Sequence, residues 1–337
     1  MPAHRHRLGA GGVDGSQAAT FQNKVAVKTA KMLDWGMAVS HRTKPVVLVS
    51  GFWRSGTTWL QEMLADSIGA KTVFEPLAPA NPRLIAMLKR IFPDSPDCRE
   101  ALIPGPRPDD NAFWRYLDDA LIGKYSCHFM LSCRQKVSEA LLDRIVVKDV
   151  RLQFNLEHIH ARYGLPVIHL RRNPFAVAAS LLAADWQWSF ERVRLADLFS
   201  EPFAAPLLAE LPGDVAEAID RDALSRIAAY WAITERFIDE TLGNKDWARV
   251  LSYERVRKAP QRELSNVCAW LGIDPIRMAD ADAPSASTHP ASTRQAPGRQ
   301  RRTLSEAQLA WVGEIVTQIY PAAFARHGAA WRAHAAP

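Results

Sequence analysis

A short glycine-containing segment carries residue types that can bind a phosphate-like anion. Gly51 and Gly56 have the spacing of the two glycines in a phosphate-binding P-loop, and the hydroxyl side chains of Thr57 and Thr58 follow directly. Glycine lets the backbone approach an anion, and the first N–H groups of a helix donate to its oxygens. A P-loop that binds a nucleoside triphosphate carries lysine at the position of Thr57, so triphosphate chemistry is not expected here. Arg54 supplies a cation within the loop instead, which favours a smaller anion that is placed differently.

A second candidate anion-binding pair, Arg172 and Ser180, lies further along the chain. The arginine is followed by Asn173 and Pro174, which are residue types that cap and open a helix, so Ser180 is expected about two turns into that helix. Taken alone, this segment is also typical of an ordinary strand–helix junction with a surface arginine.

The segments around these residues predict a parallel α/β sheet. Residues 46–49 form an unbroken apolar run, which is typical of a strand buried on both faces, and a helical pattern begins near Leu60. Further strands are predicted at 71–76, 144–151, 165–171 and 246–254, and further helices at 21–37, 154–163, 221–241, 261–271 and 304–320. Thr303 and Glu306 have the spacing of a capping box at the start of the last helix. Because strands and helices alternate, we predict an α/β protein in which helices flank a central parallel sheet.

Two charged side chains are predicted at the edge of this sheet where ligands bind. Glu75 ends the second strand and Lys148 lies at the far end of the third, and ligands of open α/β sheets lie off the carboxyl ends of the strands. Glu75 is a candidate general base, although it could instead bind acceptor hydroxyls or pair with an arginine to fix its loop. His169 is expected to be packed inside its strand. Strand alternation is expected to turn Asp149 to the face opposite Lys148.

The composition is that of a globular protein with a surplus of positive charge. The chain has 337 residues, of which 48% are hydrophobic and 23% are charged, and its formal net charge is +6. This charge suits anionic ligands without requiring nucleic acid. The cysteines form no C-x-x-C pair, and His158 and His160 would point to different sides of a helix, so neither a disulfide framework nor a metal site is expected. No apolar run reaches membrane-spanning length, so we expect a cytoplasmic protein without a stable membrane anchor.

The first loop resembles the 5′-phosphosulfate loop of sulfotransferases that use 3′-phosphoadenosine-5′-phosphosulfate (PAPS). The matching residues are Arg54, Ser55, Gly56, Thr57, Thr58 and Trp59. The second segment is similar to the family motif in which an arginine and a serine hold the 3′-phosphate, and these two residues are Arg172 and Ser180 here. The resemblance also implies that Tyr253 lies near the adenine, on which Trp59 would stack. An arginine-rich loop at 283–303 would cover the 3′-phosphate through residues such as Arg299 and Arg301.

This resemblance implies one sulfotransferase domain with a three-layer P-loop-like fold at 21–337, behind a flexible basic tail at 1–20. Residues 97–143 would form a helical insertion on the acceptor side. PAPS is the implied co-substrate, Arg54, Lys148 and Glu75 are the implied catalytic residues, and no metal is required. Val150 stands where the phenol and steroid branch has a catalytic histidine. The carbohydrate and bacterial branch is therefore favoured, with a glycan, glycolipid or small metabolite that accepts the sulfuryl group on a hydroxyl or an amine.

Two other functions stay open at this stage. A P-loop kinase would need lysine at the position of Thr57 and a carboxylate for Mg²⁺ at a strand end. A non-enzymatic protein could bind an anionic polymer through the arginine-rich loop, but it would not need the buried strand–loop–helix. We expect no nucleic-acid partner and leave open a homodimer.

Overall fold

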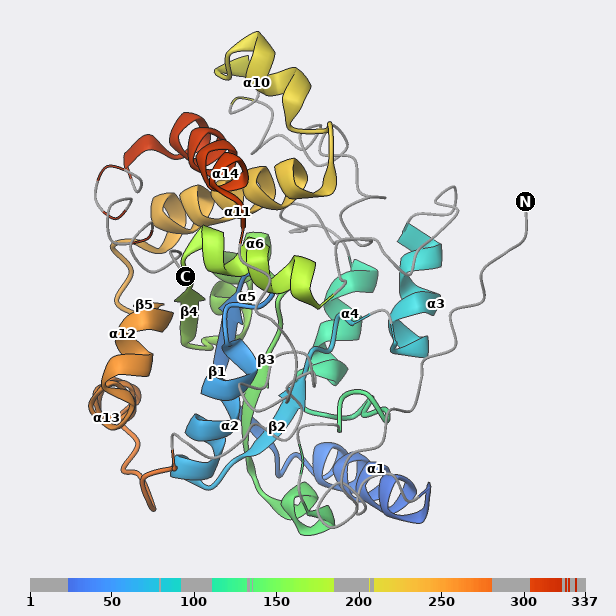
Figure 1. Ribbon diagram of the computed structural model, residues 1–337. Coiled ribbons are helices and arrows are strands. Elements are labelled where there is room, and N and C mark those ends of the chain that lie inside the picture. The colour runs from blue at the N-terminus through green and yellow to red at the C-terminus, as the bar shows by residue number, and fades with distance from the viewer. Residues whose placement is uncertain are drawn as a thin grey trace.

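The sheet at the centre of the molecule is parallel throughout and has five strands (Figure 1). The computed structural model describes residues 24–78, 80–91, 111–131, 134, 136–184, 206, 209–280, 304–322, 325, 327 and 331. The strands are β1 (Lys44–Gly51), β2 (Lys71–Phe74), β3 (Arg144–Lys148), β4 (Val167–Arg171) and β5 (Ala248–Ser252), and their order in the sheet is β2-β3-β1-β4-β5. The predicted α/β fold class with a central parallel sheet is confirmed.

Helices connect the strands and cover both faces of the sheet. They are α1 (Lys24–Val39), α2 (Thr57–Ile68), α3 (Pro82–Ile91), α4 (Asn111–Ala120), α5 (Leu156–Tyr163), α6 (Pro174–Ala183), α10 (Gly213–Ala218), α11 (Ala223–Leu242), α12 (Tyr253–Lys258), α13 (Pro260–Leu271) and α14 (Glu306–Ile319). Two short 3₁₀ turns, η1 (Val137–Leu141) and η2 (Gln153–Asn155), flank β3.

The three layers are visible in the way the core divides. On one face of the sheet, Val47 and Val49 pack with side chains of α2 and α13. On the other face, Leu48 packs with side chains of α3, α4 and α5 and with the last turns of α11. Successive residues of a strand point to opposite faces, so the continuous apolar run of β1 is what burial on both faces requires.

The carboxyl ends of the five strands form one edge, and the candidate residues follow those ends. The parallel register sets Lys148 beside Phe74 on one side and beside Val49 on the other. On the far side of β1, Gly51 lies beside Leu170, and Arg171 lies beside Ser252. The loop after β1, Glu75 after β2, Lys148 in β3 and Arg172 after β4 are therefore brought to the same edge.

Two helix starts differ from the sequence-based expectation. Helix α14 begins at Glu306 with Ser305 as its N-cap, and the capping box pairs Ser305 with Gln308, so the box proposed for Thr303 and Glu306 was wrong. Tyr253 opens α12 instead of continuing β5, because the Ser252 hydroxyl accepts a hydrogen bond from the N–H of Arg255 and caps the new helix. Within the helical insertion proposed at 97–143, α4 covers only Asn111–Ala120 and ends before Gly123, whose φ is 80°.

Candidate functional site

The loop between β1 and α2 has a backbone shape that depends on glycine. Arg54 and Gly56 have φ angles of 65° and 88°, in the left-handed region. A Cβ atom on Gly56 would lie 2.5 Å from the ring of Tyr253, so both the conformation and the space exclude a side chain at this position. Gly56 is also the N-cap of α2 and offers no side chain to cap the first turn. The first N–H groups of α2 are thus directed towards the loop, as a site for an anion requires.

The two predicted anion-binding segments meet at this loop. The guanidinium of Arg54 donates from Nε to the hydroxyl of Ser180, at 3.1 Å, across 126 positions of sequence. Arg172 donates from Nη1 to the carbonyl oxygen of Arg54, at 2.7 Å, across 118 positions. Asn173 caps α6 by accepting from the N–H of Phe175, which fixes the turn that carries Arg172, and the predicted cap is confirmed.

Burial makes this pair of arginines costly in the absence of an anion. The pKa of Arg54 is lowered to about 10, first by burial and then by the positive charge of Arg172. Burial also lowers the pKa of Arg172, although Tyr253 and Glu254 act in the opposite direction. The Nε of Arg172 and the hydroxyl of Ser55 are buried without a hydrogen-bond partner. An anion at this point would offset the charge and satisfy both groups.

Aromatic side chains lie beside the loop. The guanidinium of Arg172 lies over the ring of Tyr253, 4.6 Å from its centroid. Tyr253 in turn meets Trp59 edge to face at 6.1 Å, and Arg257 lies over the Trp59 ring at 4.9 Å. Trp59 is only half-buried and packs at the margin of the core. The structure therefore places Trp59 and Tyr253 next to each other, while stacking of an adenine on Trp59 stays a prediction.

A second charged cluster joins Glu75, Lys148 and Arg151. One carboxylate oxygen of Glu75 accepts from Lys148 Nζ, and the other accepts from Arg151 Nη1 at 2.9 Å. The ammonium of Lys148 also lies 4.5 Å from the centroid of the Phe74 ring. Glu75 adopts a φ of 40°, which turns its side chain back towards β3. This arrangement corresponds to one of the alternatives for Glu75, namely an ion pair with an arginine.

The ion pairs decide the protonation state of Glu75. Burial alone would raise its pKa, but the charges of Lys148 and Arg151, and the hydrogen bonds that both donate, lower the pKa to about 2. Glu75 is thus ionised at neutral pH, and in this state it is a weak base. Its predicted role as general base therefore requires that its ion pairs with Lys148 and Arg151 change when substrates bind.

Asp149 links the two turns that carry this cluster. Its carboxylate accepts from the backbone N–H of Leu77 at 2.8 Å and from that of Arg151 at 2.7 Å. One buried carboxylate therefore ties the turn that carries Glu75 to the turn that carries Arg151. Burial raises the pKa of Asp149 to about 6; the charge of Arg151 opposes the increase and that of Glu75 adds to it. Sequence reasoning missed the roles of Asp149 and Arg151, and their position just after a strand that ends in lysine was the available signal.

Two of the histidines considered from the sequence have structural partners. His169 is fully buried, and its Nε2 lies 3.1 Å from Glu235, as expected for a packed residue. His160 stacks on Trp247 at 4.0 Å. Among the described residues no group of histidine, cysteine or acidic side chains could hold a metal ion. Arg299, Arg301 and the whole loop at 283–303 lie outside the described residues, as does part of the insertion proposed at 97–143.

The central parallel sheet with helices on both faces makes this an α/β protein, and the sequence defines the family. The model of the sulfotransferase family matches residues 45–277, which is most of the chain. The protein belongs to the sulfotransferase family.

Several solved structures are similar to this chain at low identity. A sulfotransferase from Alicyclobacillus acidocaldarius has 14% identity over 86% of this chain and 99% of its own, with a TM-score of 0.44. Sulfotransferase STF1 from Mycobacterium tuberculosis has 16% identity over 89% and 85%, with a TM-score of 0.40. Mouse sulfotransferase SULT7A1 complexed with PAP has 14% identity over 94% and 95%, with a TM-score of 0.40. No curated protein matches the sequence at a significant level.

Proposed function

We propose that the protein transfers a sulfuryl group from PAPS to a hydroxyl or an amine of an acceptor. One observation carries the proposal: Arg54, Arg172 and Ser180, which come from two separate sequence motifs, meet at the start of α2. A structural junction alone does not require two partly buried arginines beside each other, since their like charges and their desolvation both oppose burial. An anionic ligand supplies the missing counter-charge.

The residues at the loop fit the two anionic groups of PAPS. The first turn of α2 and the Ser55 hydroxyl offer uncharged donors, and Arg54 offers a cation, which together suit the 5′-phosphosulfate. Arg172 and Ser180 lie on the other side of Arg54 and suit the 3′-phosphate. Tyr253 and Trp59 form an aromatic margin that suits the adenine.

PAPS supplies an activated sulfuryl group whose bond to the phosphate oxygen breaks as a new bond to the acceptor forms. The acceptor oxygen or nitrogen loses a proton, and the bisphosphate leaves with the electron pair of the broken bond. Arg54 and Lys148 provide fixed positive charge where negative charge develops. Glu75 takes the acceptor proton on a carboxylate oxygen.

Lys148 links these two tasks. In the structure its ammonium is held by Glu75, which keeps the pKa of Glu75 low. A second anion near Lys148 would compete for the ammonium, and Glu75 would then become more basic because one of its two cations is shared. Arg151 would still hold the other carboxylate oxygen and keep Glu75 in place. The low pKa of Glu75 is therefore a property of the resting state and is compatible with a role as base.

The acceptor that we propose is a glycan, glycolipid or small metabolite. Val150 is buried and apolar where the phenol and steroid branch carries its catalytic histidine, so proton transfer has to rely on another group such as Glu75. No helix of the described residues has the length and apolar content to cross a membrane. We propose the cytoplasm as the site of the reaction, because Cys268 is a buried free thiol and the cysteines form no C-x-x-C pair.

Thermal stability in the presence of candidate ligands tests the proposal against its two rivals. Adenosine 3′,5′-bisphosphate should stabilise the protein, by about 2.7 kcal/mol at a hundredfold excess over its Kd, whereas ATP with Mg²⁺ or an oligonucleotide should not. Stabilisation by ATP with Mg²⁺ alone would favour a kinase, and stabilisation by the oligonucleotide alone would favour a polymer-binding protein. Incubation with labelled PAPS and a panel of acceptors then identifies the acceptor.

A further inference from the structure

Helix α1 carries an outer face on which lysines and large apolar side chains are intermixed. Four of the seven large hydrophobic side chains that are exposed among the described residues belong to this helix: Val25 (70% exposed), Met32 (66%), Trp35 (54%) and Val39. Lys24, Lys28 and Lys31 are exposed on the same side. At 100° per residue these seven side chains share one half of the helix, so they form a continuous surface, which we call the α1 face.

The inner side of α1 is fixed to the body of the protein. Asp34 is fully buried and accepts from Lys71 Nζ at 3.1 Å, from Arg134 Nη1 at 2.8 Å and from the hydroxyl of Ser126 at 2.7 Å. A buried carboxylate with three donors is strongly constrained in position. The helix therefore presents the α1 face as a rigid platform, and its exposed apolar side chains are not needed to hold it.

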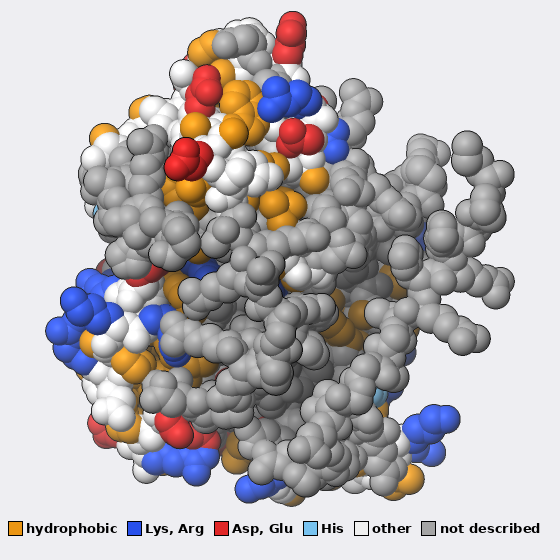
Figure 2. Space-filling view, in the orientation of Figure 1, with side chains coloured by type: hydrophobic (Ala, Val, Ile, Leu, Met, Phe, Trp, Pro, Cys, Tyr) orange, Lys and Arg blue, Asp and Glu red, His pale blue; other side chains and the backbone are white. Residues whose placement is uncertain are grey.

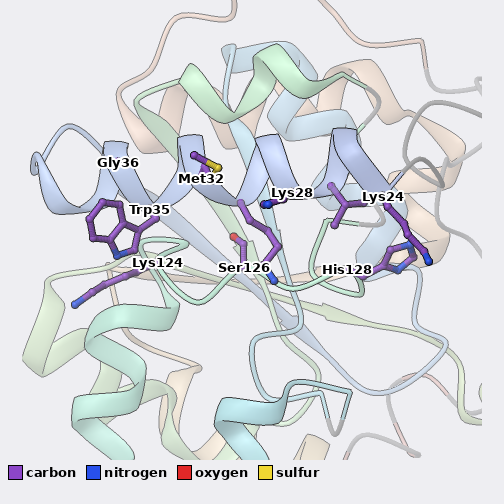
Figure 3. A pocket seen from close by; sticks show the side chains of 10 residues that line it. Lys24, Lys28, Met32, Trp35, Gly36, Lys124, Ser126 and His128 are labelled. Atoms are coloured by element: carbon purple, nitrogen blue, oxygen red, sulfur yellow. The ribbon is translucent and has the colours of Figure 1, made fainter.

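A groove runs along this platform (Figure 3). It has a volume of about 860 Å³ and lies between α1 and the segment that carries Lys124, Ser126 and His128. None of its ten lining residues is acidic. Two carboxylates on or beside these segments are already paired, Asp34 as described and Asp119 with Lys124 at 2.7 Å. In Figure 2, basic and hydrophobic side chains lie side by side at the lower right, over α1.

We propose that the α1 face docks the protein on an anionic bilayer surface. Lysines attract the anionic headgroups, and their long aliphatic stems allow neighbouring apolar side chains to enter the interface. Trp35 is a residue type that favours the boundary between headgroups and acyl chains. A second copy of the chain fits this face poorly, because self-association would bring the three lysines of one helix close to those of the other.

The docking surface and the sulfuryl-transfer site lie at opposite ends of the sheet. Helix α1 leads into the start of β1 and packs on η1, which precedes β3, whereas the arginine pair and Glu75 lie at the carboxyl ends of the strands (Figure 1). Binding to a bilayer therefore leaves the candidate active site open. The inference is independent of the proposed function, and nucleotide binding should be the same on and off the membrane.

Co-sedimentation with vesicles tests the proposal. The full chain should bind vesicles of phosphatidylcholine with phosphatidylglycerol and should not bind phosphatidylcholine alone. Replacing Lys24, Lys28 and Lys31 with glutamine should weaken binding about a hundredfold, at about tenfold or less for each lysine. Trp35→Ala should weaken it about tenfold. The matched control replaces three exposed cations elsewhere, Lys245, Lys258 and Arg262, with glutamine, and should bind vesicles nearly as well as the wild type.

The measurements also separate the other occupants. Adenosine 3′,5′-bisphosphate should shift the melting temperature of every variant equally, which shows that each is folded. If the triple lysine variant does not fold, the electrostatic contribution is measured instead from the affinity of the wild type for vesicles at increasing salt, which should fall steeply. Equal losses for the lysine and control variants would overturn the proposal. The proposal would also be overturned if the protein bound polyglutamate as tightly as vesicles and Trp35→Ala had no effect, because this would indicate an acidic protein partner. It would be overturned as well if the wild type did not bind vesicles but formed a dimer that Trp35→Ala abolishes.

Discussion

Replacing Glu75 with glutamine removes the charge at the centre of the cluster with Lys148 and Arg151. The pKa of this carboxyl falls from an ordinary 4.5 to about 2 in the folded protein, because the two cations outweigh the effect of burial. A difference of this size corresponds to about 3 kcal/mol of folding free energy at neutral pH. The side chain is only 12% exposed, so solvent screening reduces this value little. Glu75→Gln should therefore lower the free energy of unfolding by about 3 kcal/mol at pH 7.

The pH dependence distinguishes this cause from a packing defect. A carboxyl whose folded pKa lies below its unfolded value contributes stability that is complete above about pH 4.5 and is lost as the pH falls towards 2. Denaturant unfolding should thus show a difference between wild type and Glu75→Gln that is full at pH 7 and has largely closed by about pH 2.5. Glu157→Gln is the control, since its pair with Lys245 is half-exposed and should matter little at any pH. A difference that is the same at both pH values would refute the electrostatic reasoning.

The same variant tests the proposed chemistry. Glutamine keeps the shape of Glu75 and removes its basicity, so affinity for adenosine 3′,5′-bisphosphate should stay near wild type while kcat falls by about a hundredfold or more. Steady-state kinetics with a working acceptor measure both quantities. A near-normal kcat with a raised KM for the acceptor would make Glu75 a binding residue and not the base.

Three further changes probe the cofactor side of the site. Arg172→Ala should weaken binding of adenosine 3′,5′-bisphosphate by about ten- to a hundredfold and binding of AMP much less, because only the former has a 3′-phosphate. Titration calorimetry measures both affinities, and equal losses for the two nucleotides would count against the assignment. Trp59→Phe should keep the fold and reduce nucleotide affinity modestly, whereas an unchanged affinity with a large fall in melting temperature would assign Trp59 to the core. Gly56→Ala should reduce both the melting temperature and nucleotide binding, because Gly56 has a φ of 88° and a Cβ atom there would lie 2.5 Å from the Tyr253 ring. Gly164→Ala is the control and should lower only the melting temperature, because Gly164 has a φ of 62° but open space around its Cβ position.

The strand–loop–helix could be predicted because its signals are local. Apolar residues 46–49, two glycines and a helical pattern follow each other without interruption, and each is determined by a few neighbouring residues. The meeting of Arg54 with Arg172 and Ser180 is a long-range contact that we did not predict from the sequence, although parallel strands bring the residues after their carboxyl ends to one edge. Motif resemblance then added the roles that spacing alone could not supply.

The ion pairs around Glu75 could not be predicted in the same way. The expected strand alternation does not apply to Asp149, because β3 ends at Lys148 and Asp149 follows the strand. The geometry of the turn after β3 depends on hydrogen bonds that the N–H groups of Leu77 and Arg151 donate to Asp149. Leu77 and Asp149 are 72 positions apart in the sequence. Pairing of this kind depends on turn geometry at two strand ends at once, which a sequence pattern does not encode.

The two carboxylates of this cluster show why geometry has to be considered before pKa in choosing the base. Asp149, with a pKa raised to about 6, is the better base of the two by pKa alone. However, Asp149 is fully buried, and its oxygens accept from the N–H groups of Leu77 and Arg151, so it cannot reach an acceptor without opening both turns. Glu75 has a pKa of about 2, but its side chain is 12% exposed, and in the reaction that we propose an anion would compete with it for Lys148. We therefore propose Glu75 as the base, because its side chain has an exposed edge and its pKa would rise if Lys148 were shared with an anion.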